Sequence, residues 1–291
     1  MKLKGQLLVA ELVVGFFATT MIATAPAFAN NNNNAAVSSS TTVVQDPRYG
    51  DVFSGFVQLA RSTSLVDFQD GTRKDGMDYL TRFNLKLNKD YNLRLDGGYS
   101  QDLKNSDSND FGDTSLSLVR KPVAVGRTFM MGYSLAAIAP TSKDSHVRQN
   151  LQAGTSASLI TMINPDRLIP GWAIVSGISF RKNFHQYDTA IDGSVNTAYS
   201  SSQSISITYD FPIGITLSGE FAHKNAWTYQ NNVKEAFEHT EEVGYAFNKT
   251  VSAAVGHTNS GNALKANGQD SNIELVNENT SLIYASTTVA F

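Results

Sequence analysis

The chain has 291 residues, no cysteine, and 23 basic against 26 acidic residues, which gives a formal net charge of −3. The lack of cysteine excludes a small domain held together by disulfides. The sequence contains neither a basic cluster nor a nucleic-acid-binding motif, so we exclude nucleic acid as a partner.

The first 29 residues have the pattern of a secretory signal peptide. Lys2 and Lys4 precede an apolar stretch that runs to about Ile22, and the small residues of a cleavage site end at Ala29. The apolar stretch is interrupted by Glu11 and is too short for a stable membrane helix. We therefore expect export, with cleavage after Ala29.

Two further segments follow the expected signal peptide. Residues 30–50 are rich in Asn, Ser and Thr and show no apolar period, which is typical of a disordered lead-in, here in the periplasm. From residue 51 to 291 the pattern changes to strand-like runs separated by turn residues, with no helical period. The sequence thus predicts one β domain over residues 51–291.

Within this domain, apolar and polar side chains alternate with a period of two. In one run Tyr79, Phe83 and Leu85 alternate with Arg82 and Asn84, as in a strand that offers a different environment to each face. We predict twelve strands, with ten or fourteen as open alternatives because strand ends are hard to place. The predicted runs are approximately 53–64, 77–87, 91–101, 113–121, 127–140, 149–163, 171–183, 202–211, 214–226, 236–247, 251–259 and 280–291.

The last run, Thr280 to Phe291, carries no charge, and its alternate residues from Ile283 to Phe291 suit a lipid surface. It resembles the closing strand of bacterial outer-membrane β-barrels, in which the terminal aromatic residue marks the strand for insertion. This resemblance implies that Phe291 is an assembly signal read by the barrel-assembly machinery. The alternative is the last strand of a soluble sandwich.

The connections favour the barrel. Three are very short (88–90, 212–213 and 248–250), whereas those on the other side are long and polar (65–76, 102–112, 141–148, 184–201, 227–235 and 260–279). Short periplasmic turns, long outer loops and aromatic residues near both strand ends are typical of outer-membrane barrels. We predict an all-β, antiparallel, up-and-down transmembrane barrel in the Gram-negative outer membrane, in contact with lipid and lipopolysaccharide.

The inner face of such a barrel would carry charges on two walls. A short turn at 88–90 pairs Arg82 with Asp96, Asn84 with Arg94, and Lys86 with Asn92. Folding the loop 227–235 about Asn231 pairs Lys224 with Glu238 and Glu220 with Glu242. The predicted lining residues are Arg82, Asn84, Lys86, Arg94, Asp96, Asp210, Glu220, Lys224, Glu238 and Glu242.

In a ring of twelve, the basic strands lie across from the acidic ones. This arrangement resembles the constriction of general porins and implies a channel for small polar or ionic solutes. Two alternatives remain: ordinary solvated residues, or paired charges that fill the bore of a structural barrel whose loops 184–201 and 260–279 serve adhesion or recognition. Residues 111–118 and 139–143 resemble the strand and loop pattern of barrels grouped with aromatic-compound uptake. The resemblance covers two strands.

Catalysis has little support in the sequence. His257 and Ser260 lie three residues apart, so they face opposite sides of a strand and cannot form a nucleophile with its base. A lipid-modifying enzyme is therefore the weakest alternative, and we expect neither a cofactor nor a metal.

All five histidines are predicted near the strand ends that carry the long outer loops. The same registers place His223 opposite His239, and His257 opposite Glu241, so three imidazoles would form an outer-interface cluster. We favour histidine as a residue that suits a half-wet interface. Contact with lipopolysaccharide phosphates is the next explanation, and a shared metal the last, because Glu241 is the only carboxylate in reach.

Overall fold

The computed structural model describes residues 52–66, 73–104, 108–265 and 267–291. The predicted signal peptide and the lead-in up to residue 50 lie outside these described residues. In the described part of the chain, no helix has the length and apolar character needed to cross a membrane.

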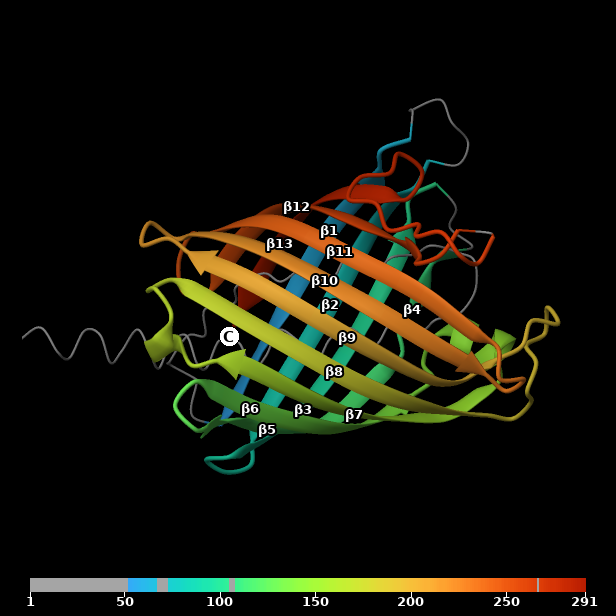
Figure 1. Ribbon diagram of the computed structural model, residues 1–291, viewed down its shortest axis with the longest axis horizontal. Helices are drawn as coiled ribbons and strands as arrows, with labels where there is room; N and C mark the ends of the chain where they lie inside the picture. Colours follow the sequence, from blue (N-terminus) through green and yellow to red (C-terminus); the bar gives the residue numbers. More distant parts are fainter. Residues whose placement is uncertain (1–51, 67–72, 105–107, 266) are drawn as a thin grey trace, which may run out of the picture.

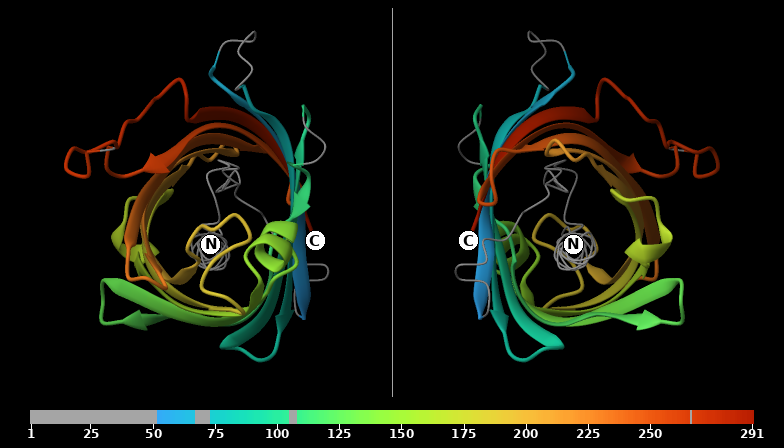
Figure 2. Two further views of the ribbon diagram at one scale, coloured as in Figure 1. Left: turned by 90° about the vertical axis from the view of Figure 1, so that its right-hand side faces the viewer. Right: turned by 90° about the vertical axis from the view of Figure 1, so that its left-hand side faces the viewer.

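Twelve long antiparallel strands form a closed ring (Figures 1 and 2). Each strand pairs with its neighbours in sequence, β3 pairs with β5, and β1 pairs with β13 to close the ring. The predicted number of twelve is confirmed. The strands are β1 (Phe53–Ser64), β2 (Asp75–Lys86), β3 (Tyr91–Asp102), β5 (Thr114–Val125), β6 (Phe129–Ala139), β7 (Leu151–Ile163), β8 (Trp172–His185), β9 (Thr197–Asp210), β10 (Ile215–Thr228), β11 (Val233–Ala246), β12 (Val251–Asn262) and β13 (Ser281–Ala290).

Three short elements lie in the connections. The two-residue strand β4 (Asp110–Phe111) pairs with the end of β3, a single helical turn η2 (Asp144–Arg148) lies between β6 and β7, and η3 (Pro165–Arg167) lies between β7 and β8. The predicted strand ends agree with the structure to within a few residues, with the largest difference at the start of β9.

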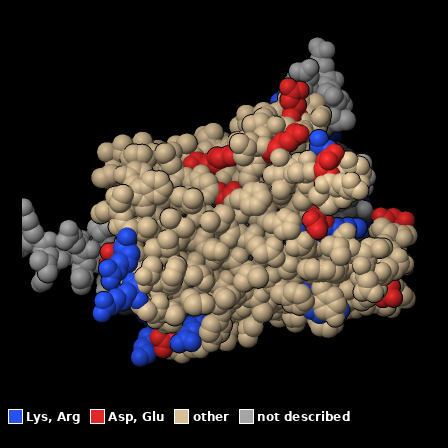
Figure 3. All heavy atoms as spheres, viewed as in Figure 1, with Lys and Arg blue, Asp and Glu red and all other residues tan. Residues whose placement is uncertain are grey.

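The two faces of the ring differ in chemistry because successive side chains of a strand point to opposite sides. Large apolar side chains such as Val243 and Ile207 are exposed on the outside, whereas polar ones such as Gln58, Arg94 and Thr288 are buried on the inside. On the face shown in Figure 3, Lys and Arg gather near the two ends, and the middle of the wall is uncharged apart from a few acidic atoms. This is the pattern of a barrel in lipid.

The seam between the first and last strands is closed by backbone and aromatic contacts. The Gly55 amide donates to the Phe291 carbonyl at 2.8 Å, and the Phe291 amide donates to the Gly55 carbonyl at 3.0 Å. The Phe291 ring lies 5.9 Å from that of Phe53 and 6.0 Å from that of Phe83. A Cβ at position 55 would lie only 2.3 Å from the Arg82 carbonyl oxygen, so glycine permits this close approach.

Four connections at one end of the ring are short, with residues 87–90, 126–128, 211–214 and 247–250 between strands, whereas the fifth, 164–171 between β7 and β8, has eight residues and contains η3. The other end carries the long connections 65–74, 140–150, 186–196 and 263–280. One prediction is wrong: the connection expected over 227–235 is a tight turn of residues 229–232, because β10 and β11 extend further than the apolar period indicates.

Candidate functional site: the inner wall

A buried ionic cluster lies on the inner faces of β2 and β3. The predicted register is confirmed, with Arg82 opposite Asp96 and Asn84 opposite Arg94. Asp96 bridges both arginines, at 2.5 Å from the Nε of Arg82 and 3.2 Å from the Nε of Arg94. Because the arginine side chains are only 2% and 1% exposed, this one carboxylate is the counter-charge for two buried guanidinium groups.

The cluster leaves part of its positive charge without a hydrogen bond. Among the described residues, neither terminal nitrogen of Arg94 has a hydrogen-bond partner. Lys86 lies further along the same face, is exposed, and stands opposite Asn92 as predicted.

The hairpin of β10 and β11 has a different register from the predicted one. Lys224 lies opposite Ala236 and Glu238 opposite Ala222, a shift of two residues. The turn explains the shift. The Thr228 amide donates to the Asn232 carbonyl at 2.9 Å, so Asn231, with a φ of 62°, is the last of three loop residues and not the centre of the hairpin, as in hairpins whose last loop residue is left-handed. A two-residue shift keeps every side chain on its predicted face.

The contact between Lys224 and Glu238 survives the shift, because the long lysine side chain reaches Glu238 diagonally and forms an ion pair with it. The predicted pairing of Glu220 with Glu242 is wrong, since Glu220 lies opposite Thr240 and Glu242 opposite Ser218. The two carboxylates therefore do not form a directly paired acidic site.

Glu242 instead binds a tyrosine two strands away. The Tyr284 hydroxyl on β13 donates to a carboxylate oxygen of Glu242 on β11 at 2.8 Å. Gly256 on β12 lies between them in the same row, and a Cβ there would be 2.4 Å from the Tyr284 ring. Tyr284 was not among the predicted lining residues, although the inward position of residue 284 and the glycine at 256 both point to it.

The ring order shows which strands face one another across the barrel. In the ring of twelve, β2 and β3 lie across from β9 and β10. The latter carry Asp210, which accepts a hydrogen bond from the Thr216 hydroxyl at 2.7 Å, and Glu220. Glu238 and Glu242 extend this acidic side onto β11. Residues of the opposite sign also lie on each side: Asp78 and Asp96 on β2 and β3, and Lys224 on β10.

The connection between β6 and β7 folds into the ring, where Figure 2 shows its helical turn η2 within the circle of strands. Asp113 holds it: one Asp113 oxygen accepts a hydrogen bond from the Ser145 hydroxyl at 2.9 Å and lies 3.4 Å from Arg181 on β8. Burial raises the pKa of the Asp144 carboxyl in this turn, while the hydrogen bond from Gln149 acts in the opposite direction.

The long connection 186–196 contacts this turn. The Ile191 amide donates to the Arg148 carbonyl at 2.9 Å, and the Asn196 side chain donates to the Gln149 carbonyl at 3.0 Å. Two connections that join different strand pairs thus meet at the outer end of the ring. No sequence pattern predicts this contact, because it depends on where each loop folds.

His223, His239 and His257 are on the outer wall, but only His239 and His257 form a cluster, with ring centroids 5.7 Å apart. The register shift places His223 opposite Phe237 instead of His239, and the Nδ1 of His223 lies 3.2 Å from a Gln203 side-chain oxygen. His257 lies opposite Glu241, as predicted.

Comparisons with known proteins were made at the levels of sequence and structure. No protein-family model matches the chain, and a search of curated proteins finds no match. The fold is similar to a crystal structure of an outer membrane channel from Pseudomonas putida F1, with 13% identity, coverage of 82% of this chain and 95% of that one, and a TM-score of 0.57. The chain has the fold of an outer-membrane β-barrel.

Two further solved structures are similar to this barrel at lower TM-scores. The KdgM porin is 8% identical, with coverage of 81% and 99% and a TM-score of 0.45. OmpT of Vibrio cholerae, an outer-membrane protein, is 8% identical, with coverage of 82% and 97% and a TM-score of 0.42.

Proposed function

We propose that this protein is a channel of the Gram-negative outer membrane that lets small polar or ionic solutes pass. The observation that carries the proposal is the pair of facing inner walls, with Arg82 and Arg94 on one side and Asp210 and Glu220 on the other. Opposed charges set an electric field across the path, and this field orients a solute that has a dipole or charges at both ends.

The details of the two walls suggest how ions would be distinguished. Arg82 and Arg94 place two positive charges in one wall, and their field attracts an anionic group. Glu220 and Glu242 provide acceptors for a cationic one. The η2 turn lies within the ring at the end with the long connections, so a solute that enters there would meet it before the charged walls.

The proposed location follows from the outer face and the chain ends. The exposed apolar side chains suit contact with lipid, and the loop-rich end would meet lipopolysaccharide. We propose that export removes the signal peptide near Ala29 and that Phe291 is read by the assembly machinery. No catalytic role is proposed, because His257 faces outward and Ser260, paired with the inward Glu238, faces the bore.

The test is electrical. Purified mature protein in a planar bilayer should give stepwise conductance, and a salt gradient across the bilayer should give a reversal potential that reports ion selectivity. Replacing Arg82 and Arg94 with Gln should shift this potential toward cations, and replacing Glu220 and Glu242 with Gln should shift it toward anions. Arg61→Gln is the matched control, because Arg61 is exposed on the outer face of β1.

One observation favours a second function, a closed structural barrel that presents its loops for adhesion or recognition. Four charged side chains of the inner wall, Arg82, Arg94, Lys224 and Glu242, are at most 5% exposed, as in a bore filled by paired residues. Absence of conductance from protein that still shows heat-modifiable migration, and is therefore folded, would support this function and reject the channel.

A further inference from the structure

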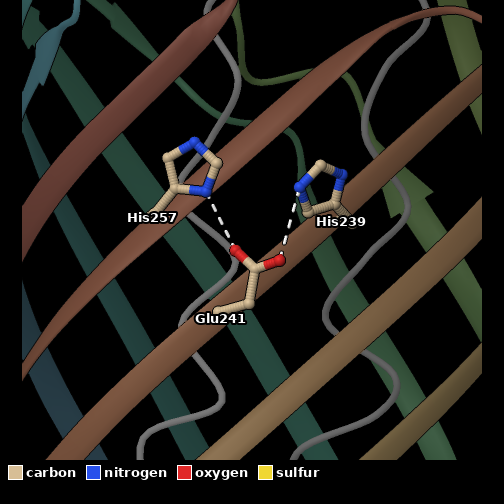
Figure 4. A group of neighbouring side chains, drawn as sticks. All are labelled: His239, Glu241 and His257. Atoms are coloured by element: carbon tan, nitrogen blue, oxygen red, sulfur yellow. Dashed lines mark hydrogen bonds and ion pairs between the residues drawn. The ribbon is translucent and has the colours of Figure 1, made fainter. Parts of the chain in front are cut away.

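Three polar side chains form a compact group on the outer wall, separate from the inner walls. His239 and Glu241 come from β11 and His257 comes from β12, and Figure 4 shows both rings directed at the carboxylate. Glu241 lies 2.9 Å from the Nδ1 of His257 through one oxygen and 3.4 Å from the Nε2 of His239 through the other. One ligand atom from each residue lies within 4.8 Å of the other two.

The group contains polar atoms without a hydrogen bond in the described structure. His239 is 4% exposed, and neither of its ring nitrogens has a hydrogen-bond partner among the described residues. The Nε2 of His257 is also buried without one. Buried polar atoms in proteins almost always have a partner, and a bound ion can supply the partner that the protein itself does not.

Neighbouring residues fix the group in place. The His239 ring stacks on Phe237, with centroids 6.3 Å apart and an angle of 11° between the planes. Asn259, opposite His239 on β12, donates to the Glu274 carbonyl at 2.7 Å and accepts from the Thr280 hydroxyl at 2.6 Å. The connection between β12 and β13 is thereby held beside the two histidines.

The position of the group is costly unless it binds something. Below it, the same outer face continues with the exposed apolar residues Val243 and Val255. A charged or polar group that interrupts a lipid-facing surface destabilises a barrel, so a carboxylate and two imidazoles need compensation there. A divalent cation would neutralise the carboxylate and bind one nitrogen of each imidazole.

We propose that His239, Glu241 and His257 bind a divalent transition metal of the zinc class. Two imidazole nitrogens and one carboxylate oxygen are a common zinc ligand set, with each ligand atom at about 2.0–2.2 Å from the ion. The fourth position faces outward, where water or a lipid phosphate completes the coordination. The ion joins β11 to β12 across the outer wall.

The test measures zinc binding to untagged, folded, mature protein in detergent by titration calorimetry. We expect one zinc ion per chain, and a thermal transition that rises when zinc is added. His239→Gln, Glu241→Gln and His257→Gln should each weaken binding at least about 100-fold, since even residues that only orient a ligand cost 10–100-fold. His223→Gln, on the same wall outside the group, should keep the affinity of the unchanged protein.

Several results would overturn the proposal: no stoichiometric binding, binding that survives all three substitutions, or an equal loss in His223→Gln. If a variant fails to fold, zinc X-ray absorption on the unchanged protein decides the matter. Two imidazole ligands and one carboxylate in the first coordination sphere support the site, whereas any other ligand set rejects it. Channel activity plays no part in these readouts, so this proposal and the proposed function fail independently.

Discussion

The two faces of each strand follow opposite rules. On the outer face Val243 is 53% exposed, and on the inner face Arg94 is 1% exposed, which reverses the distribution in a soluble protein. The reversal shows that a charge is tolerated where a group of opposite charge lies beside it, and that the exposed fraction of the position does not decide this. Arg94 has Asp96 beside it, whereas a charge placed at Val243 would meet lipid.

The largest effect should come from breaking the inner ionic cluster. Asp96→Ala removes the one carboxylate that lies between Arg82 and Arg94, and leaves two buried guanidinium groups without a counter-charge. Loss of one partner from a buried ion pair costs about 3–5 kcal/mol. Reversible unfolding in denaturant, followed by heat-modifiable migration, should show a decrease of this size in the free energy of unfolding.

A matched variant tests the reason for that loss. Replacing Arg82 and Arg94 with Met and Asp96 with Leu removes all three charges together, so no unpaired charge remains. Such replacements of whole buried ionic groups are often near neutral. A triple variant as unstable as Asp96→Ala would show that shape, and not charge, explains the effect.

A charge introduced on the lipid-facing outer face should also destabilise the barrel. Arg introduced at Phe83, Ile207 or Val243 should cost about 2–4 kcal/mol near the bilayer midplane. Arg at Ser206, on the inner face of β9, should cost much less, because Glu220 lies opposite and supplies a counter-charge. Folding titrations into lipid vesicles measure the difference, and equal penalties on the two faces would contradict the assignment of inside and outside.

A third, smaller effect concerns packing inside the ring. In Gly256→Ala the new Cβ would lie 2.4 Å from the Tyr284 ring, so the ring must move and its hydrogen bond to Glu242 is lost. Overpacking of this kind costs about 1–3 kcal/mol. Gly219→Ala on the outer face of β10 is the control, because nothing lies within 4 Å of a Cβ there. Equal stability of the two alanine variants would mean that Tyr284 does not need the space above Gly256.

These inner contacts also show what the sequence could and could not predict. Alternation over runs such as 202–211 was enough to identify all twelve strands and the face of each side chain, because the period of two is local. The register of β2 and β3 was predictable too, since the short turn at 88–90 permits few pairings. The predicted connection before β11, residues 227–235, is longer and allows more than one centre for the hairpin. Because the ends of β10 and β11 were placed too far from the turn, the predicted centre was wrong.

The rest depended on contacts between distant segments. The hydrogen bond from Tyr284 to Glu242 required both registers around β12 to be known, and the inward fold of η2 required the contact of Ser145 with Asp113. Neither contact has a local period. The His239, Glu241 and His257 group was predicted in part, because its β11–β12 register follows from the short turn at 247–250, whereas His223 depended on the wrong hairpin centre.

A fourth change should alter conduction with little effect on stability. Replacing Asp113 with Asn and Arg181 with Gln removes both members of a buried pair together, so no unpaired charge remains. Loss of this pair weakens the attachment of the helical turn, which Asp110 still holds through the amides of Lys143 and Asp144. If the pair keeps the turn in the path, single-channel conductance should rise in the double variant. Unchanged conductance would mean that this pair does not limit the flow of ions.

The smallest effect is expected where the contrast between two faces is absent. Residues 30–50 have no alternation of apolar and polar side chains, and so offer no face to lipid or to the inner wall. Deletion of residues 30–48 from the mature chain should therefore leave membrane insertion and the protease-resistant core unchanged. Limited proteolysis of the protein in vesicles measures both. Loss of the resistant core would show that this segment contributes to folding despite its composition, and the boundary of the barrel domain would then lie before residue 51.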